Sequence, residues 1–312
     1  MHDFQHICVV GAGFLGTQIG LQCAAHGYQT TLVDLSAAAR EKSQQVVTDE
    51  LNRRIAEGLH DASESSAVQA RLTYHDDLEQ GVSSADLVIE AIPERLDLKR
   101  ALFAKLDALT DSNTILATNS SSIKISAIES ATERLDKVLN MHFYGMIWDR
   151  PMVELMRGSA TSDATIQAVY RCAQRIGVTP LVVDRESTGF IFNRVWRAIK
   201  RETLHLVNDG VTSHENVDRA WMIFTGMKLG PFALMDRIGL DVICDIENVY
   251  YRESSLERDA PPPILTDRVA RGDLGCKTGK GFYTYPNPAF EDPQWLKGEV
   301  YPLMESPAAD LS

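Results

Sequence analysis

The feature that most constrains the fold lies in the first sixteen residues. The apolar stretch ICVV at 7–10 runs directly into GAGFLG at 11–16, and a helical pattern follows as far as Gly27. A strand that enters G-x-G-x-x-G and then a helix is typical of the first β-α unit of a dinucleotide-binding sheet. Gly11 would permit the tight turn, Gly13 the close approach of a pyrophosphate, and Gly16 the packing of helix on strand.

The second expected strand supports a dinucleotide site and indicates which dinucleotide. It covers residues 30–33 and ends in Asp34, about 20 residues beyond the glycines, where a carboxylate accepts hydrogen bonds from an adenosine ribose and repels a 2′-phosphate. The sequence therefore predicts NAD rather than NADP as the cofactor. The loop residues Phe14 and Leu15 should line the site together with the three glycines, since the N-terminus of the following helix offers free N–H groups to the pyrophosphate.

Composition excludes several other classes of protein. A chain of 312 residues with 44% hydrophobic and 24% charged residues is typical of an ordinary soluble globular protein, and its length favours two domains of unequal size. The net charge of −12 disfavours nucleic acid and anionic membrane as partners, and no apolar run approaches the roughly 20 residues that span a bilayer. Five scattered cysteines without C-x-x-C indicate reduced thiols in the cytoplasm and no zinc site. We therefore expect a cytoplasmic protein that acts on a small molecule, without metal.

Strand and helix patterns alternate as far as residue 186, which predicts an α/β, Rossmann-like, doubly wound domain. Beyond it only helices are expected. They cover residues 189–209, 213–224, 234–251 and 264–272. We therefore divide the chain into an NAD domain at 1–186, an all-helical domain at 187–285 and a proline-rich extended tail at 286–312.

Three polar residues should stand at the carboxyl edge of the sheet, where folds of this type bind their ligands. Ser121 and His142 follow expected strands at 114–118 and 138–141, and Glu154 lies in the next apolar segment. Six motifs in this order resemble those of the L-3-hydroxyacyl-CoA dehydrogenase family. They are TNSSS at 118–122, MHF at 141–143, VEL at 153–155, GFIFNR at 189–194, GPF at 230–232 and KTGKGFY at 277–283.

The resemblance implies a role for each matching residue. His142 would be the general acid/base, Glu154 would hydrogen-bond its far ring nitrogen, and Ser121 and Asn193 would bind the substrate oxygen. The helical domain would form a homodimer and complete the substrate site. The cofactor contacts would come from Gly11, Gly13, Gly16, Asp34, Glu94, Lys99, Ser121 and Lys277.

Two departures from the family pattern bear on the substrate. Family members usually read His-x-x-Asn-Pro at the histidine, whereas Gly145 stands here in place of the asparagine. The same loop carries Tyr144, Trp148 and Arg150, which would contact a small substrate through a ring or a guanidinium, although Trp148 packing in the core and Arg150 pairing with an acid are equally open. Residues 35–75, lysine-rich in the acyl-CoA enzymes, contain a single lysine, which makes a poor phosphate cradle.

Several functions remain open from the sequence. The leading hypothesis is an NAD-dependent alcohol/carbonyl oxidoreductase for a small carboxylate-bearing or ester substrate, similar to the diketoreductase or pyridine aldehyde carboxylate dehydrogenase branches of the family. The first alternative is a true L-3-hydroxyacyl-CoA dehydrogenase, for example for 3-hydroxybutyryl-CoA. An alternative of another class is an NAD-binding structural protein without activity, which the combination of Ser121, His142, Glu154 and Asn193 argues against.

Overall fold

The computed structural model describes residues 4–298, and the chain divides into two compact units between Phe192 and Asn193. The first unit contains a sheet whose strand order is β3-β2-β1-β4-β5-β6-β7-β8. All neighbouring strands run parallel except β6 and β7, which are antiparallel. The strands are β1 (His6–Val10), β2 (Gln29–Val33), β3 (Leu72–His75), β4 (Leu87–Glu90), β5 (Ile115–Thr118), β6 (Val138–Phe143), β7 (Met152–Arg157) and β8 (Thr179–Val183).

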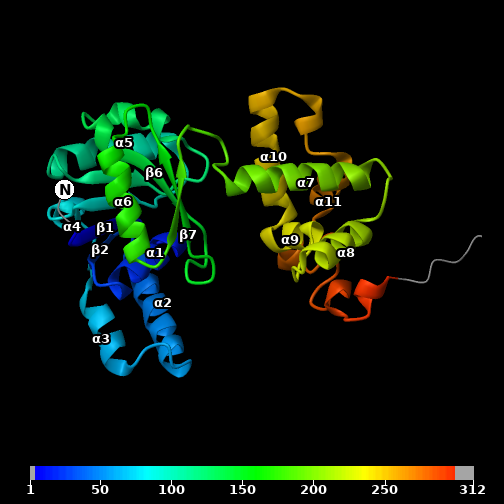
Figure 1. Ribbon diagram of the computed structural model, residues 1–312, viewed down its shortest axis with the longest axis horizontal. Helices are drawn as coiled ribbons and strands as arrows, with labels where there is room; N and C mark the ends of the chain where they lie inside the picture. Colours follow the sequence, from blue (N-terminus) through cyan, green and yellow to red (C-terminus); the bar gives the residue numbers. More distant parts are fainter. Residues whose placement is uncertain (1–3, 299–312) are drawn as a thin grey trace, which may run out of the picture. The chain divides into compact units, whose positions relative to one another are not determined.

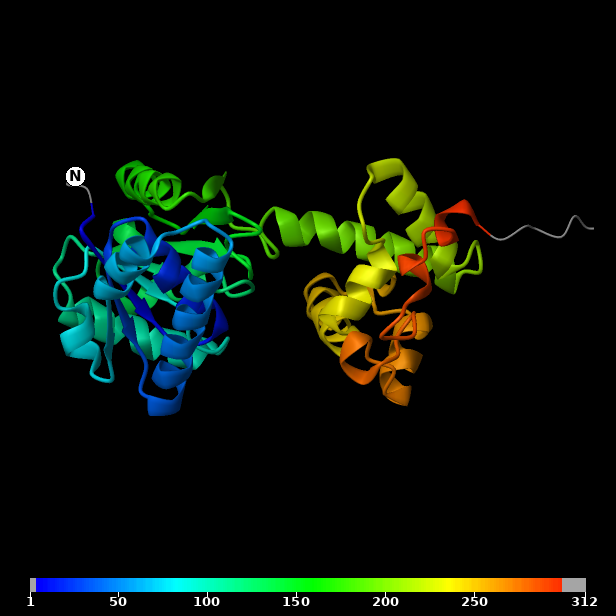
Figure 2. The same cartoon turned by 90° about the horizontal axis from the view of Figure 1, so that it is seen from below.

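The sheet is covered on both faces, which explains the continuous apolar runs in its central strands (Figure 2). One face packs against α1 (Phe14–Ala25) and α6 (Asp163–Arg175), and the other against α4 (Leu78–Val82) and α5 (Leu96–Leu109). Three short 3-10 helices, Ile125–Ala127, Glu129–Ala131 and Leu135–Lys137, lead into β6. The predicted doubly wound α/β fold is confirmed.

Two helices between β2 and β3 extend away from the sheet as an arm (Figure 1). They are α2 (Ala37–Ala56) and α3 (Ala62–Ala70), and they contact each other. Ser36 caps the first helix, and Asp61 and Glu64 form a capping box at the second. A small apolar core of Leu21, Val47, Leu51 and Val68 joins the arm to α1.

The second unit is helical in its described part, as the sequence predicts. Its helices are α7, which begins at the boundary (Phe192–Asn208), α8 (His214–Thr225), α9 (Pro231–Ile238), α10 (Leu240–Ser254) and α11 (Pro263–Arg271), with 3-10 turns at Glu257–Asp259 and Cys276–Thr278. Phe232, Leu240, Ile243 and Phe282 lie in its core.

Two predicted helix limits are wrong, both because of backbone conformations that end a helix. The single helix expected at 234–251 is in fact two helices, because Gly239 adopts a φ of 108° between α9 and α10. The helix expected from residue 189 begins only at Phe192, because Gly189 and Phe190 adopt φ values of 78° and 52°. Helix α4 was not predicted.

The described part of the predicted tail, residues 286–298, contains two 3-10 helices, Ala289–Glu291 and Trp295–Lys297. Trp295 packs against the aromatic ring of Tyr283, and the guanidinium of Arg219 lies 4.5 Å from the centre of the Trp295 ring. This part of the tail is therefore fixed to the second unit. The rest of the tail, 299–312, lies outside the described residues.

Candidate active site

The three glycines of the first loop differ in what surrounds them. Gly11 has a φ of 112°, and a Cβ there would lie 2.5 Å from the carbonyl oxygen of Ala91. A Cβ at Gly16 would overlap the carbonyl oxygen of Gly11. At Gly13, in contrast, no atom lies within 4 Å of where a Cβ would stand. The loop is thus tightly packed on one side and leaves its middle glycine open to a ligand that approaches the backbone.

The end of β2 is tied to this loop by Asp34. Its carboxylate accepts hydrogen bonds from the N–H groups of Ala12 and Ser36, each at 2.9 Å. Helix α1 has no side-chain cap at Gly13, so its first N–H groups face outward, as anion binding requires. Phe14 is 69% exposed and Leu15 is half-buried. The open glycine, the uncapped helix and the carboxylate together fit the pyrophosphate and ribose of NAD.

The predicted cofactor residues Glu94 and Lys99 belong to a network under the Ser121 loop. The Lys99 ammonium is 1% exposed and lies 2.6 Å from Glu90 and 3.2 Å from Glu94. Glu94 in turn accepts hydrogen bonds from the hydroxyl groups of Ser120 and Ser122. Burial would raise the pKa of Glu94, but these serine hydrogen bonds and the Lys99 charge outweigh it and lower the pKa. The Lys99 charge therefore stabilises the ionised form of Glu94.

Ser121 stands between the two serines that Glu94 holds. It is exposed, and its hydroxyl group makes no hydrogen bond to the described part of the chain. Glu94 holds this loop through the neighbours of Ser121, because Ser122 also donates its N–H to Glu94 at 3.0 Å. The structure thus presents the Ser121 hydroxyl at the carboxyl edge of the sheet.

His142 and Glu154 are brought together by the one antiparallel pair of strands in the described sheet. They are direct partners in the β6–β7 register, and Nδ1 of His142 lies 3.1 Å from Oε2 of Glu154. The Glu154 side chain is fully buried and the His142 side chain is 5% exposed. With Nδ1–H donated to the carboxylate, Nε2 is the ring nitrogen left for a reactant.

Glu154 accepts four hydrogen bonds. Its Oε1 accepts from the N–H groups of Ile191 (2.9 Å) and Phe192 (2.8 Å), and its Oε2 accepts from His142 and from the Tyr144 hydroxyl (2.9 Å). Burial alone would raise the pKa of Glu154, but the hydrogen bonds from His142, Phe192, Tyr144 and Ile191 lower it. The carboxylate is therefore ionised at neutral pH and ready to stabilise a protonated imidazole.

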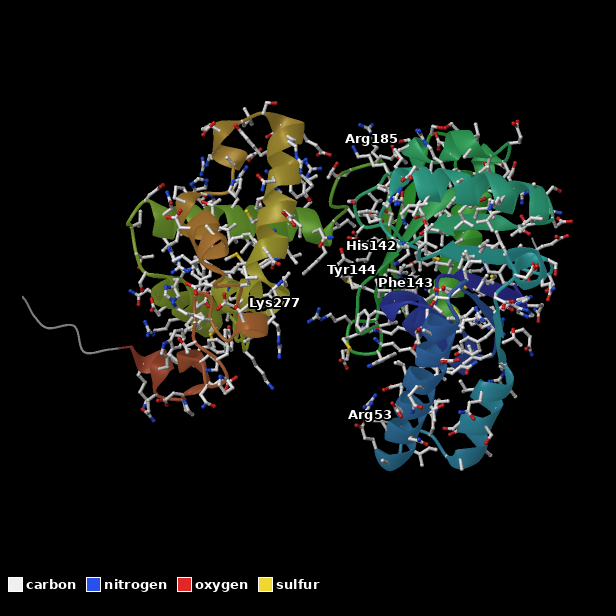
Figure 3. All side chains as sticks on the ribbon, turned by 180° about the vertical axis from the view of Figure 1, so that it is seen from behind. Arg53, His142, Phe143, Tyr144, Arg185 and Lys277 are labelled. Carbon is white, nitrogen blue, oxygen red and sulfur yellow. The ribbon has the colours of Figure 1, made fainter. Side chains whose placement is uncertain are left out.

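The imidazole of His142 has an aromatic ring on each of two sides. Its centre lies 4.5 Å from that of the Tyr144 ring and 4.9 Å from that of Phe190. Figure 3 shows His142 and Tyr144 close together at this end of the sheet. Phe190 and Met146 have positive φ values of 52° and 62°, and such strained residues cluster at functional sites. The contribution of Phe190 and of the two N–H groups that follow it was not predicted from the sequence.

The loop after His142 accounts for Gly145. A Cβ at this position would lie 3.0 Å from the Phe14 ring, so the glycine makes room for that ring. Trp148 packs in the small core of the arm, with the Arg54 guanidinium 5.5 Å from its ring centre. Arg150 is exposed, and its guanidinium has no ion-pair partner among residues 4–298. The structure thus separates the two: Trp148 packs inward, while Arg150 stays available to an anion.

Two arginines of the arm are paired with acids on the same helix. Arg53 contacts Glu50 at 2.7 Å and also Glu57, and Arg54 contacts Glu50 at 2.9 Å. Figure 3 shows Arg53 toward the far end of the arm, away from His142. These pairs offset the charge of Arg53 and Arg54, and Arg40 of α2 pairs with Asp76, which follows β3.

Asn193 and Lys277 belong to the second unit. Asn193 is the second residue of α7, directly after the N–H groups that Glu154 holds. Lys277 pairs with Asp241 at 2.5 Å. Within residues 4–298 no helix has the length and apolar character to cross a membrane, and no group of three or more potential metal ligands is present.

Comparison with known proteins identifies the family. Residues 6–187 match the 3-hydroxyacyl-CoA dehydrogenase NAD-binding domain, and residues 189–285 match the C-terminal domain of the same family. A 3-hydroxybutyryl-CoA dehydrogenase of Clostridioides difficile is 33% identical over 89% of this chain and 99% of its own. The (S)-3-hydroxybutyryl-CoA dehydrogenase of Ralstonia eutropha superposes with a TM-score of 0.86 at 33% identity, covering 91% of this chain and 100% of that one.

A diketoreductase described as acting on dicarbonyl compounds is similar to the same extent. It superposes with a TM-score of 0.81 at 34% identity and covers 91% of this chain and 100% of that one. The matched domains confirm NAD as the cofactor predicted from the glycine loop and Asp34. The chain therefore belongs to the 3-hydroxyacyl-CoA dehydrogenase family of NAD-dependent dehydrogenases.

Proposed function

We propose that the protein moves hydride reversibly between an alcohol or carbonyl carbon and NAD, with His142 as the acid/base. The hydrogen bond from His142 to the buried, ionised Glu154 carries this proposal. In the direction of oxidation, Nε2 takes the proton of the substrate hydroxyl while Nδ1–H stays on the carboxylate, which stabilises the imidazolium. NAD, when bound, accepts the hydride of the carbinol carbon.

The other predicted residues receive complementary roles in this proposal. The exposed hydroxyl of Ser121 and the amide of Asn193 bind the substrate oxygen, and the network of Lys99 and Glu94 holds the Ser121 loop in place. The open backbone at Gly13 and the carboxylate of Asp34 hold the cofactor, with Phe14 and Leu15 beside it. Lys277 is a cofactor contact by resemblance only.

We further propose that the substrate is a small carboxylate-bearing or ester compound rather than a coenzyme A thioester. The arm arginines Arg40, Arg53 and Arg54 each pair with a carboxylate, which reduces the positive charge that the arm offers to a nucleotide phosphate. Arg150, on the loop that follows His142, is the exposed cation that would bind a carboxylate, and the similarity to the diketoreductase agrees with a small carbonyl substrate.

A coenzyme A thioester is the second candidate, because relatives that match over nearly their whole length are named 3-hydroxybutyryl-CoA dehydrogenases. The deciding experiment measures the rate of NADH oxidation with each of several substrates and compares these rates. The substrates are acetoacetyl-CoA, free 3-oxo acids, diketo esters and pyridine aldehyde carboxylates. Turnover confined to the thioester would overturn the small-substrate proposal. Binding of NADH without turnover on any compound would indicate the structural alternative instead.

Arg150 allows the carboxylate part of this proposal to be tested separately. Arg150→Met should raise KM for a free oxo acid about tenfold or more and leave KM for an uncharged diketo ester unchanged, because only the acid loses a charge-assisted hydrogen bond. Equal effects on both substrates would exclude a carboxylate contact.

We also propose that the protein is a cytoplasmic homodimer joined through its helical unit, with residues 187–285 as the dimerisation domain. Helix α10 exposes Val242, Ile246 and Val249, which are spaced to form one apolar face and are between 37% and 42% exposed. Light scattering that gives the mass of a single chain would contradict the dimer. Recovery of the protein outside the cytoplasmic fraction would contradict its location.

A further inference from the structure

Tyr144 shares a hydrogen-bond acceptor with His142. Its hydroxyl donates to Oε2 of Glu154 at 2.9 Å, and the same oxygen accepts Nδ1–H of His142 at 3.1 Å. The other oxygen of Glu154 is occupied by the N–H groups of Ile191 and Phe192. The charge of one buried carboxylate is therefore divided among four donors, of which only His142 takes part in the proposed proton transfer.

The Tyr144 hydroxyl is held in this position by packing of its ring. The ring contacts the imidazole of His142 on one side and meets the ring of Phe192 edge-on, with centres 5.4 Å apart. A ring fixed between two others loses little further freedom when its hydroxyl forms a hydrogen bond. Removing the hydroxyl alone would therefore leave the ring contacts in place.

We propose that Tyr144 is a positioning residue of the His142–Glu154 pair, because its hydroxyl takes up part of the charge on Oε2 and weakens the attraction of Glu154 for an imidazolium. This inference deepens the proposed function and rests on it. A donor that already hydrogen-bonds Oε2 stabilises the carboxylate and weakens its attraction for an imidazolium proton. Neutral His142 is the form that accepts the alcohol proton, so Tyr144 favours the direction of oxidation.

The groups around the pair agree with this assignment. The titratable side chains that hydrogen-bond Glu154 within residues 4–298 are those of His142 and Tyr144. Leu181 of β8 lies opposite Glu154, and the rings of Phe190 and of Phe192, the first residue of α7, pack against His142 and Tyr144. The elements that pack here also carry charged groups. They are Arg157, which pairs with Asp163 at the other end of β7, the residues Asp184, Arg185 and Glu186 after β8, and Arg194, two residues beyond Phe192 on α7.

The test is Tyr144→Phe, which removes one oxygen atom and keeps the ring. The pKa of His142 is measured by NMR titration of the full-length protein with labelled histidine, and the His142 signal is assigned by its loss in His142→Gln. We expect Tyr144→Phe to raise the pKa of His142 by about half a unit to one unit. Tyr170→Phe is the matched control, because the Tyr170 hydroxyl makes no hydrogen bond to the described residues.

A second pair of variants tests whether the effect passes through the carboxylate. In a Glu154→Gln background, adding Tyr144→Phe should shift the His142 titration by less than about 0.2 unit, because the shared charge is gone. An unchanged His142 pKa in Tyr144→Phe, or an equal shift in both backgrounds, would overturn the proposal.

Enzyme kinetics distinguishes the effect of Tyr144 on the His142–Glu154 pair from the role of His142 as acid/base. With the panel compound that is turned over fastest, the pH profile of kcat/KM for oxidation should move upward by the same amount as the NMR pKa. A shift in the NMR pKa without a shift in the rate profile would support the tuning by Tyr144 and contradict His142 as the acid/base.

Discussion

Glu154→Gln is the substitution whose outcome the structure determines in most detail. The Gln side chain has the same shape, but only one of its two terminal atoms accepts a hydrogen bond. The N–H groups of Ile191 and Phe192 lie 2.9 and 2.8 Å from Oε1, so they require the amide oxygen at this position. The amide nitrogen must then point its N–H groups at His142 and Tyr144.

This orientation reverses the tautomer of His142. An amide N–H donor 3.1 Å from Nδ1 requires Nδ1 to be the acceptor, so the single proton of the neutral ring moves to Nε2. A protonated Nε2 cannot take the proton of an alcohol. Replacing the carboxylate of a catalytic triad by its amide lowers kcat about 10⁴-fold for this reason, and we expect a loss of about 10³- to 10⁴-fold here, or roughly 4–5.5 kcal/mol in the barrier.

The assay follows kcat for alcohol oxidation together with NADH affinity by fluorescence. Affinity should be unchanged, and ¹⁵N NMR should show the His142 proton on Nε2. Glu129→Gln serves as the control, since Glu129 is a buried carboxylate of the same unit that accepts the N–H of Ser159 without contacting His142. A Glu154→Gln variant that keeps kcat within tenfold would refute the reasoning, whichever tautomer it shows.

Three further substitutions test other parts of the structure. Lys99→Met leaves Glu90 as an uncompensated buried charge and should lower the free energy of unfolding by about 3–5 kcal/mol in a urea titration. A loss below about 1 kcal/mol would show that the Lys99–Glu90 ion pair contributes little to stability. Gly16→Ala places a methyl group on the Gly11 carbonyl, so NADH binding and the melting temperature should both fall, and unchanged NADH binding would show that the loop adapts. For Asp259, burial would raise the pKa, but hydrogen bonds from a serine and two arginines outweigh it and lower the pKa to about 2. Because this lies below the unfolded value of about 3.9, ionised Asp259 stabilises the second unit above pH 4, and this contribution is lost as the pH falls from about 4 toward 2. The gap in unfolding free energy between wild type and Asp259→Asn should therefore narrow over that window, and a constant gap would contradict the assignment.

Much of the first unit could be predicted from local sequence, because the signals act within a few residues. The apolar run before Gly11, the spacing of the glycines and the acid at the end of β2 each depend on the local backbone. The break between α9 and α10 was missed, since an isolated glycine is tolerated in many helices and only the left-handed backbone of Gly239 shows that it ends one.

The sequence by itself determined the class of fold and the NAD loop, and its resemblance to the family predicted His142 and Glu154 as the acid/base pair. Tertiary structure alone decided what surrounds that pair. The antiparallel course of β7 sets Glu154 opposite His142, and N–H groups 37 and 38 residues further along the chain complete its hydrogen bonds. Strand direction and such distant contacts leave no periodic trace in a sequence, because they depend on how separate segments pack and not on the conformation of any one of them.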